Sequence, residues 1–231
     1  MIMIFSSCSA KKNDHTQINP SGPLATPSYY LEDKHSILAL ERTRESIFRN
    51  EAAMVGSRKT YAYDLYVRTG RAYNAVNSEY YGEIKKALVE KRGIEWFFLS
   101  GGFGIIHALE EAWNYQATFN CSIAYQEGIP YTANIWKTLL PQLCDSAISR
   151  LSPDWVYVFG SRDYTRFIKE TNVWDENDNI KIIESTGSAG TIWLSKKLAE
   201  LMYSFFNYEL PKFNGSYKKF TKQNALSKGS L

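Results

Sequence analysis

A buried strand that runs directly into a glycine-rich turn is the feature that most constrains this fold. Residues 94–100 (Ile-Glu-Trp-Phe-Phe-Leu-Ser) hold a continuous apolar run, which is typical of a strand covered on both faces. Gly101, Gly102 and Gly104 follow, and glycine lets the backbone turn sharply and approach a bound group closely. We expect this turn to open a helix over residues 103–115, whose first amides would face a ligand at the edge of the sheet. The turn lacks the full dinucleotide-binding fingerprint and the Lys-Ser/Thr pair of a phosphate loop.

Strands alternate with helices along the rest of the chain. This alternation predicts an α/β fold in which a mostly parallel sheet is covered by helices. Strands are expected at residues 1–5, 96–99, 154–159 and 179–184, and helices at residues 35–53, 70–91, 103–115, 131–150 and 189–206. We expect a single domain over residues 1–210. Residues 211–231 hold five lysines and no acidic residue, which predicts a basic, flexible tail that either stays solvated or lies along a phosphate backbone.

The composition of the 231 residues narrows the class of protein. The formal net charge of +3 permits an anionic partner without requiring one. Cys8, Cys121 and Cys144 share no ligand spacing, so neither a disulfide scaffold nor a structural zinc is expected. The apolar start of the chain is too short for a signal peptide and no basic residue precedes it, so we interpret it as the first strand. No apolar stretch approaches the roughly 20 residues of a membrane span, and we expect a reduced, cytoplasmic protein without membrane contact.

Polar loops follow three of the expected strands. Because the carboxyl ends of neighbouring parallel strands meet at one edge of a sheet, these loops are expected to enclose a pocket. Lysines, hydroxyls, free amides, an arginine and a carboxylate would together suit an anionic or sugar-phosphate ligand. The alternative for the third loop is that Asp163 caps its helix and Arg162 pairs with a surface acid. The first loop supplies Cys8, Ser9, Lys11, Lys12 and Asn13, the second supplies Ser100, Gly101, Gly102, Phe103 and Gly104, and the third supplies Ser161, Arg162, Asp163 and Tyr164.

Other reactive residues are more scattered. Glu110 would lie two turns into the helix after the glycine turn, where it would face either the pocket or water. The three histidines are dispersed and no metal-binding spacing occurs, so we expect neither a metal nor a cofactor. Cys8 lies beside lysines, and as a nucleophile it would need a base, for which His15 is one candidate.

Several short motifs occur in a characteristic order. Residues 8–11 (Cys-Ser-Ala-Lys) follow the first strand, residues 99–106 contain the glycine turn, and residues 159–164 (Phe-Gly-Ser-Arg-Asp-Tyr) follow a later strand. Further matching elements are Asp64-Leu65-Tyr66, Leu109-Glu110, Tyr115, Trp136 and residues 180–183. In order and spacing these motifs resemble the YaaA-like or peroxide stress family and its shorter relatives from bacteria and phages. The resemblance covers about residues 3–206, with a helical insertion over residues 28–58.

The resemblance implies an α/β fold distantly similar to uracil-DNA glycosylases, with a positive cleft. Family members are linked to DNA binding and oxidative stress, and related domains occur among enzymes that handle modified guanine bases. The leading hypothesis is therefore a DNA N-glycosylase that flips out and excises a modified base, with an antiviral role suggested by the modified bases of phage DNA. In this hypothesis the roles are divided as follows: stacking by Tyr66, Phe103, Tyr115 or Tyr164, phosphate contacts by Lys11, Lys12 and Arg162, and stabilisation of the sugar cation by Glu110, Asp163 or Asp64.

Two further contributions to catalysis and two alternative functions stay open. An unprotonated Lys11 or Lys12 would attack the sugar, form a Schiff base and nick the strand. Amides of the glycine turn would take up charge on the leaving base. The alternatives to a glycosylase are a non-catalytic, DNA-binding stress protein and an enzyme that acts on a free nucleotide or nucleoside.

Overall fold

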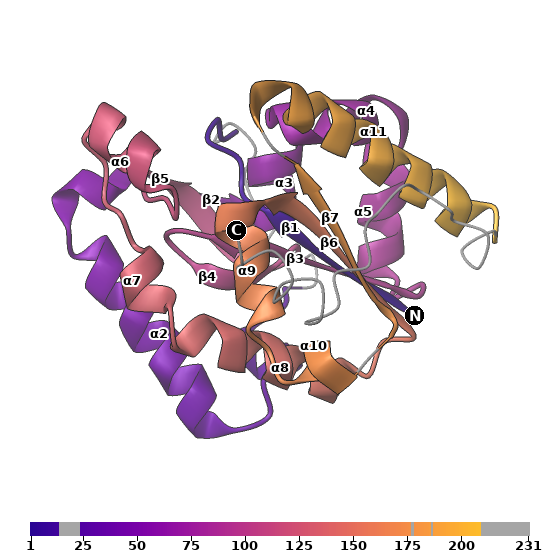
Figure 1. Cartoon of the computed structure of the whole chain (residues 1–231), viewed down its shortest axis with the longest axis horizontal. Helices are drawn as coiled ribbons and strands as arrows, with labels where there is room; N and C mark the ends of the chain where they lie inside the picture. Colours follow the sequence, from indigo (N-terminus) through magenta and orange to yellow (C-terminus); the bar gives the residue numbers. More distant parts are fainter. Residues whose placement is uncertain (14–23, 177, 186, 209–231) are drawn as a thin grey trace, which may run out of the picture.

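A mostly parallel sheet forms the centre of the computed structural model, which describes residues 1–13, 24–176, 178–185 and 187–208 (Figure 1). Within these residues the sheet has five strands in the order β4-β3-β1-β6-β7. The parallel strands are β1 (Ile2–Ser7), β3 (Ile94–Ser100), β6 (Trp155–Ser161) and β7 (Ile180–Ser185). The short strand β4 (Gly104–His107) pairs antiparallel with β3. The predicted α/β class and the four predicted strands are therefore confirmed.

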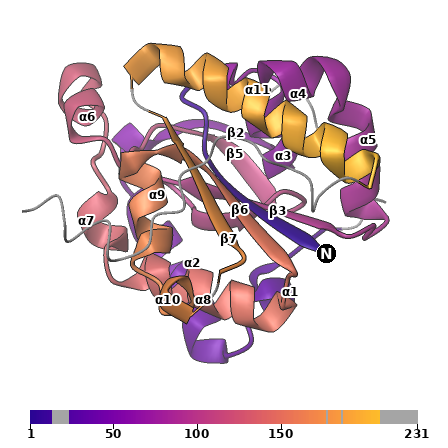
Figure 2. The same ribbon diagram turned by 45° about the vertical axis from the view of Figure 1, so that its right-hand side comes forward.

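Helices cover both faces of this sheet (Figure 2). On one face lie α4 (Asn74–Glu79), α5 (Tyr81–Val89) and the long α11 (Gly187–Phe206). On the other face lie α1 (Pro27–Tyr30), α2 (Lys34–Phe48), α8 (Leu139–Leu151) and α9 (Arg162–Lys169). Every residue of β3 is buried, as the continuous apolar run predicts for a strand between two helical layers. No helix in the described part of the chain is long and apolar enough to cross a bilayer.

The predicted helix over residues 103–115 is wrong. After the glycine turn the chain returns as β4, and it then forms β5 (Glu111–Tyr115), which pairs antiparallel with β2 (Met54–Tyr61). The β-branched pair Ile105-Ile106 favours a strand. Short apolar runs of this kind have the same hydrophobic pattern in a buried helix and in a buried strand, so periodicity alone did not separate them.

Other predicted helices are shorter or interrupted. The helix expected to reach residue 53 ends at Phe48, a 3-10 turn follows, and β2 begins at Met54, so the segment over residues 28–58 is not helical throughout. The helix expected over residues 70–91 is divided into a 3-10 turn (Arg71–Tyr73), α4 and α5. The remaining short helices are α3 (Ala62–Val67), α6 (Cys121–Glu127), α7 (Ala133–Trp136) and α10 (Val173–Glu176). The predicted tail over residues 211–231 lies outside the described residues.

Candidate functional site

The carboxyl ends of β1, β3 and β6 meet, as the three-loop prediction requires. The backbone N–H of Cys8 donates to the carbonyl oxygen of Leu99 at 2.8 Å, which ties the first loop to the end of β3. The sulfur of Cys8 lies 3.7 Å from the hydroxyl oxygen of Tyr164, which ties the same loop to the segment after β6. These contacts bring the first and third loops together at the end of β3, where the second loop begins.

A group of hydroxyls, one thiol and one amine fills this meeting point. We call it the Cys8 cluster. In it, the Tyr115 hydroxyl lies 2.6 Å from Ser100 Oγ, and the Tyr66 hydroxyl donates to the Tyr115 hydroxyl at 3.1 Å. The backbone N–H of Phe103 donates to Ser100 Oγ at 2.9 Å, so Ser100 is held from two sides. The members of the Cys8 cluster are Cys8, Lys12, Tyr66, Ser100, Tyr115 and Tyr164.

The two neighbouring lysines of the first loop differ in how far their side chains are exposed to solvent. Lys12 is half-buried, and its Nζ atom lies 4.2 Å from the centroid of the Tyr115 ring. Burial lowers the pKa of Lys12, although the charges of Cys8 and Glu127 oppose this shift. Lys11 is exposed, and its carbonyl oxygen accepts a hydrogen bond from the Thr69 hydroxyl at 3.1 Å. Lys12 is therefore the lysine that belongs to the cluster.

The tyrosine hydroxyls of the cluster are neutral groups. Burial, and secondarily the charge of Cys8, raises the pKa of Tyr115 and Tyr164 well above the usual value. The same two causes raise the pKa of Tyr66. All three phenols therefore keep their protons at neutral pH and can donate hydrogen bonds. Tyr66 and Tyr115 are buried, as is Phe103, and among the four rings predicted to stack on a base only Tyr164 keeps part of its surface exposed.

The glycine turn is occupied by the protein itself. The carbonyl oxygen of Gly101 accepts hydrogen bonds from the Thr132 hydroxyl at 2.7 Å and from Trp136 Nε1 at 3.0 Å. A Cβ atom on Gly102 would lie 2.6 Å from the Tyr115 ring, and one on Gly104, whose φ is +70°, would lie 2.5 Å from Trp136. All three glycines are buried, and what they permit is the close packing of Tyr115 and Trp136.

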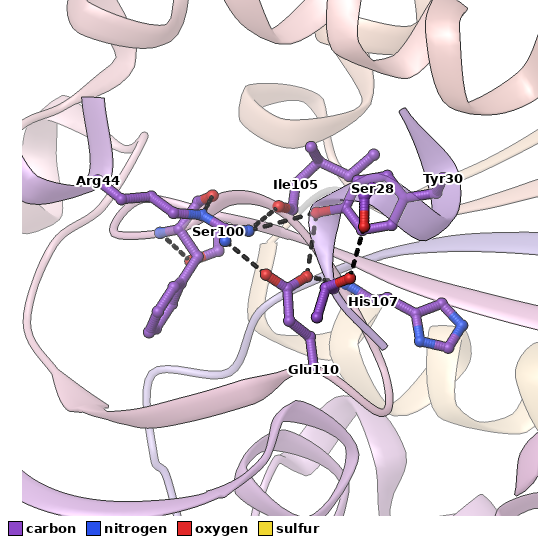
Figure 3. A network of polar contacts seen from close by, with 9 residues as sticks. Ser28, Tyr30, Arg44, Ser100, Ile105, His107 and Glu110 are labelled. Atoms are coloured by element: carbon purple, nitrogen blue, oxygen red, sulfur yellow. Dashed lines mark hydrogen bonds and ion pairs between the residues drawn. The ribbon is translucent and has the colours of Figure 1, made fainter. Parts of the chain in front are cut away.

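Glu110 lies in a buried network that reaches the Cys8 cluster through Phe103 and Ser100 (Figure 3). Its carboxylate forms an ion pair with Arg44 at 2.5 Å and accepts the Tyr30 hydroxyl at 3.0 Å. Arg44 also donates to the carbonyl oxygens of Phe103 at 2.9 Å and Ile105 at 2.5 Å. Because the N–H of His107 donates to Glu110, the Arg44–Glu110 pair joins α2 to both ends of β4 and to the glycine turn.

The other two candidate carboxylates also have defined partners. Asp64 is buried and lies 2.7 Å from Lys85 Nζ, and the Tyr81 hydroxyl donates to it. Asp163 does not cap its own helix through its side chain; it accepts from Asn120 Nδ2 at 2.6 Å. Since Asp163 precedes Tyr164 directly, it is the candidate carboxylate that lies nearest along the chain to a member of the Cys8 cluster.

The remaining predicted residues lie in the first and third loops. Ser9 and Asn13 are buried, and the N–H of Asn13 donates to the Leu65 carbonyl at 2.8 Å, which fixes the first loop on α3. Ser161 is half-buried at the start of α9, and Arg162 is exposed. Thr118, which supports Tyr164 by a hydrogen bond, was not among the residues predicted for the site. Thr118 and Glu127 lie in a segment without periodicity, and only their long-range contacts reveal them.

A second buried pair involves a histidine that looked isolated in the sequence. His107 Nε2 lies 2.8 Å from a carboxylate oxygen of Glu95, and the Tyr29 hydroxyl donates to the other oxygen at 2.5 Å. The N–H of Leu109 donates to His107 Nδ1 at 3.1 Å, so the ring proton of a neutral His107 lies on Nε2. All of these groups are satisfied by one another, which is typical of a structural network.

The Cys8 cluster offers an amine over an aromatic ring, together with several neutral hydroxyl donors. Among the residues that the structure describes, no group of three histidine, cysteine or acidic side chains is placed to hold a metal ion. No protein-family model matches the chain, and no curated protein matches it.

Proposed function

We propose that this protein is a DNA N-glycosylase, which turns a modified base out of the double helix and breaks its bond to deoxyribose. The observation that carries the proposal is the half-buried amine of Lys12 over the ring of Tyr115, whose hydroxyl is bonded to Ser100 at the joined ends of the strands. The resemblance to the YaaA-like family supports it, and the likeness to uracil-DNA glycosylases is part of the same proposal.

In this proposal, exposed cationic side chains of the first and third loops bind the DNA backbone. Lys11 and Arg162 lie in the first and third loops and are exposed, so they can contact phosphates on either side of an extruded nucleotide. Extrusion is required because the glycosidic bond cannot be reached inside the base stack. Tyr164, the half-buried ring of the cluster, is the candidate for stacking on the extruded base.

Bond cleavage requires stabilisation of charge on both sides of the glycosidic bond. The transition state carries positive charge on the sugar, which a carboxylate stabilises, and Asp163 is the candidate that adjoins the cluster. The base leaves with the bonding electrons, and neutral phenols can donate hydrogen bonds to it. Glu110 and Asp64 serve the fold in this proposal, because each is already bound to a cation.

The direct test measures bases released from DNA. The protein is incubated with unmodified DNA and with phage DNA that carries modified bases, and free bases are identified by mass spectrometry. We expect release of one modified base, and we expect Asp163→Asn to slow it while Glu170→Gln, at an exposed residue after α9, serves as a charge-matched comparison. DNA that is bound without release of any base would overturn the glycosylase proposal. A salt-sensitive affinity would then favour the non-catalytic DNA-binding protein.

The biological setting follows from the choice of substrate. Phages carry bulky modified bases that host DNA lacks, so an enzyme that excises such a base would act in antiviral defence. Release of a modified base from phage DNA, with host DNA left intact, is the expected result. Equal release from both DNAs would instead favour a role in repair.

A further inference from the structure

Lys12 differs from its neighbour in a way that suits a nucleophile. A lysine that serves as a phosphate contact keeps its ammonium hydrated, as the exposed Lys11 does. The half-buried Lys12 instead places its Nζ atom over the face of Tyr115, 4.2 Å from the ring centroid. Its nearest hydrogen-bond acceptor among the described residues is the carbonyl oxygen of Ala10, at 3.5 Å. No carboxylate of the described residues forms an ion pair with it, and its pKa is lowered by burial.

The surface on which Lys12 rests is fixed from several directions. The hydroxyl of Tyr115 is held by Ser100 at 2.6 Å and by Tyr66 at 3.1 Å. Its ring packs so closely on Gly102 that a Cβ atom there would lie 2.6 Å away. Residues first considered as direct ligands of the substrate, Ser100 and Gly102, thus hold the ring that faces the amine. An aromatic face excludes water from one side of the amine and offers it only the weak attraction of the ring electrons instead of the full charge of a carboxylate.

None of the three candidate carboxylates is assigned as the nucleophile, because each already has a partner. Glu110 is paired with Arg44, and Asp64 is paired with Lys85, both in buried surroundings. Asp163 is bound by Asn120, and in the proposed function it stabilises charge on the sugar rather than bonding to it. An uncharged amine needs no such acid to react with an electrophilic carbon, whereas it does need to be free of its proton.

We propose that Lys12 Nζ is the covalent nucleophile of this site and that its substrate is the C1′ carbon of a deoxyribose, including the aldehyde of an abasic site. Ser100 and Tyr66 act as positioning residues, because they reach Lys12 only through Tyr115. For its DNA substrate this inference rests on the proposed function. It adds to that function a covalent Schiff-base step and a strand-cleaving activity.

The covalent step balances without any outside oxidant. When a base is still attached, the amine nitrogen bonds to C1′ while the C1′–N bond to the base breaks; the base leaves with the electron pair and takes up the amine proton. The C1′–O4′ bond then breaks, O4′ takes up a proton from water, and the opened sugar is left as a protonated imine on Lys12. When the sugar is an abasic aldehyde, the nitrogen adds to C1′ and water leaves, which gives a protonated imine. Loss of a proton from C2′ then breaks the C3′–O bond to the phosphate, and water releases Lys12.

The experiment uses the full chain and a duplex with a single abasic aldehyde. Sodium borohydride supplies hydride, which reduces the imine to a stable amine and leaves the protein linked to DNA. We expect peptide mass spectrometry of the wild-type adduct to locate the link on Lys12. Lys12→Arg is expected to lose the adduct, and Lys137→Arg, at an exposed lysine outside the three loops, is expected to keep it. A link on Lys11 or on a lysine of residues 211–231, or no link at all, would overturn the proposal.

The positioning role has its own measurement. The groups around the Lys12 amine are Cys8 from the first loop, Glu127 from α6 and the Tyr115 ring from β5. Ser100→Ala frees the Tyr115 ring and admits water to the amine, so the pH at half-maximal trapping is expected to rise. A variant that acts only by destabilising the fold would lower the yield at every pH without moving this midpoint, and that result would reject the positioning role.

The two proposals fail separately. Release of a modified base without any borohydride adduct would keep the glycosylase and overturn the Lys12 nucleophile. Adduct formation on abasic DNA without release of any base would support the Lys12 nucleophile and overturn the glycosylase, leaving a strand-cleaving enzyme for abasic sites.

Discussion

The hydroxyl of Tyr115 lies 2.6 Å from Ser100 Oγ, and this contact ties the end of β5 to the end of β3. The glycine-rich turn supports the Tyr115 ring, because Gly102 lies directly against that ring. The ring in turn faces Lys12 on the first loop. The glycine turn, which we expected to bind a ligand directly, therefore supports the ring that faces the proposed nucleophile.

Removing the Tyr115 hydroxyl tests how much this support contributes. Tyr115→Phe leaves the Ser100 and Tyr66 hydroxyls without their shared partner in a buried site. We expect the free energy of unfolding to fall by about 1–2 kcal/mol, measured by urea denaturation. Tyr125→Phe is the control, because Tyr125 is 90% exposed and its variant should unfold like the wild type. Equal effects of the two substitutions would contradict the assignment.

The Arg44–Glu110 pair is expected to stabilise the fold and not to react. Arg44→Met leaves a buried carboxylate uncompensated, and we expect a loss of about 3–5 kcal/mol. The double variant Arg44→Met/Glu110→Leu should lose less than the two single variants together, which a double-mutant cycle measures. The exposed pair Glu45–Arg49 is the control and should contribute less than about 1 kcal/mol. A stable Glu110→Leu variant without base release would instead assign Glu110 to catalysis.

Two glycines offer a matched test of close packing. A Cβ atom on Gly101 would lie 2.6 Å from the backbone nitrogen of Thr118, whereas one on Gly82 in α5 would meet nothing within 4 Å. We expect Gly101→Ala to lower the free energy of unfolding by about 1–3 kcal/mol through overpacking. Gly82→Ala should raise it by about 0.5–1 kcal/mol, since alanine favours a helix. Stabilisation by both substitutions would mean that the turn is looser than described.

Long, strongly apolar elements could be predicted from the sequence. The runs that became β1, β3 and β6 are continuous and buried, so their parallel packing and the meeting of their carboxyl ends followed from the alternation of strands and helices. By contrast, β2, β4 and β5 could not be separated from helix by periodicity. They are short, and pairing with a distant strand decides their conformation.

Part of the candidate site could likewise be predicted from the sequence, and part could not. Cys8, Lys12 and Tyr164 followed from their places after strands, and the structure brings them together. The partner of Glu110 could not be found this way, because Arg44 lies 66 residues earlier on a helix whose face is chosen by tertiary packing. Nor could the sequence tell Lys11 from Lys12, since their directions depend on how the first loop is anchored at Thr69 and Leu65.

Glu184 gives the fold a component of stability that depends on pH. Burial alone would raise the pKa of Glu184, but hydrogen bonds from Lys169 and Thr165 outweigh it and lower the pKa below the usual 4.5. A carboxyl with a lowered pKa in the fold stabilises it above the unfolded value, and this contribution is lost as the pH falls through the folded value. Glu184→Gln should therefore destabilise most near neutral pH, with a difference that shrinks below about pH 4.5 in urea unfolding. A difference that stays constant with pH would contradict the ion pair.

The opposite sign is expected for Lys12. Its pKa in the fold lies below the usual 10.5, so below the folded value the protonated amine carries a desolvation penalty that the unfolded chain lacks. Lys12→Met removes this penalty and should raise the free energy of unfolding at neutral pH, and the gain should shrink as the pH rises toward 10.5. Urea denaturation between neutral pH and pH 10 measures it, and the exposed Lys11→Met is the control, with little effect at any pH. A destabilised Lys12→Met protein at neutral pH would show that the Tyr115 ring stabilises the charged ammonium, and the amine would then be too well protonated to act as the nucleophile.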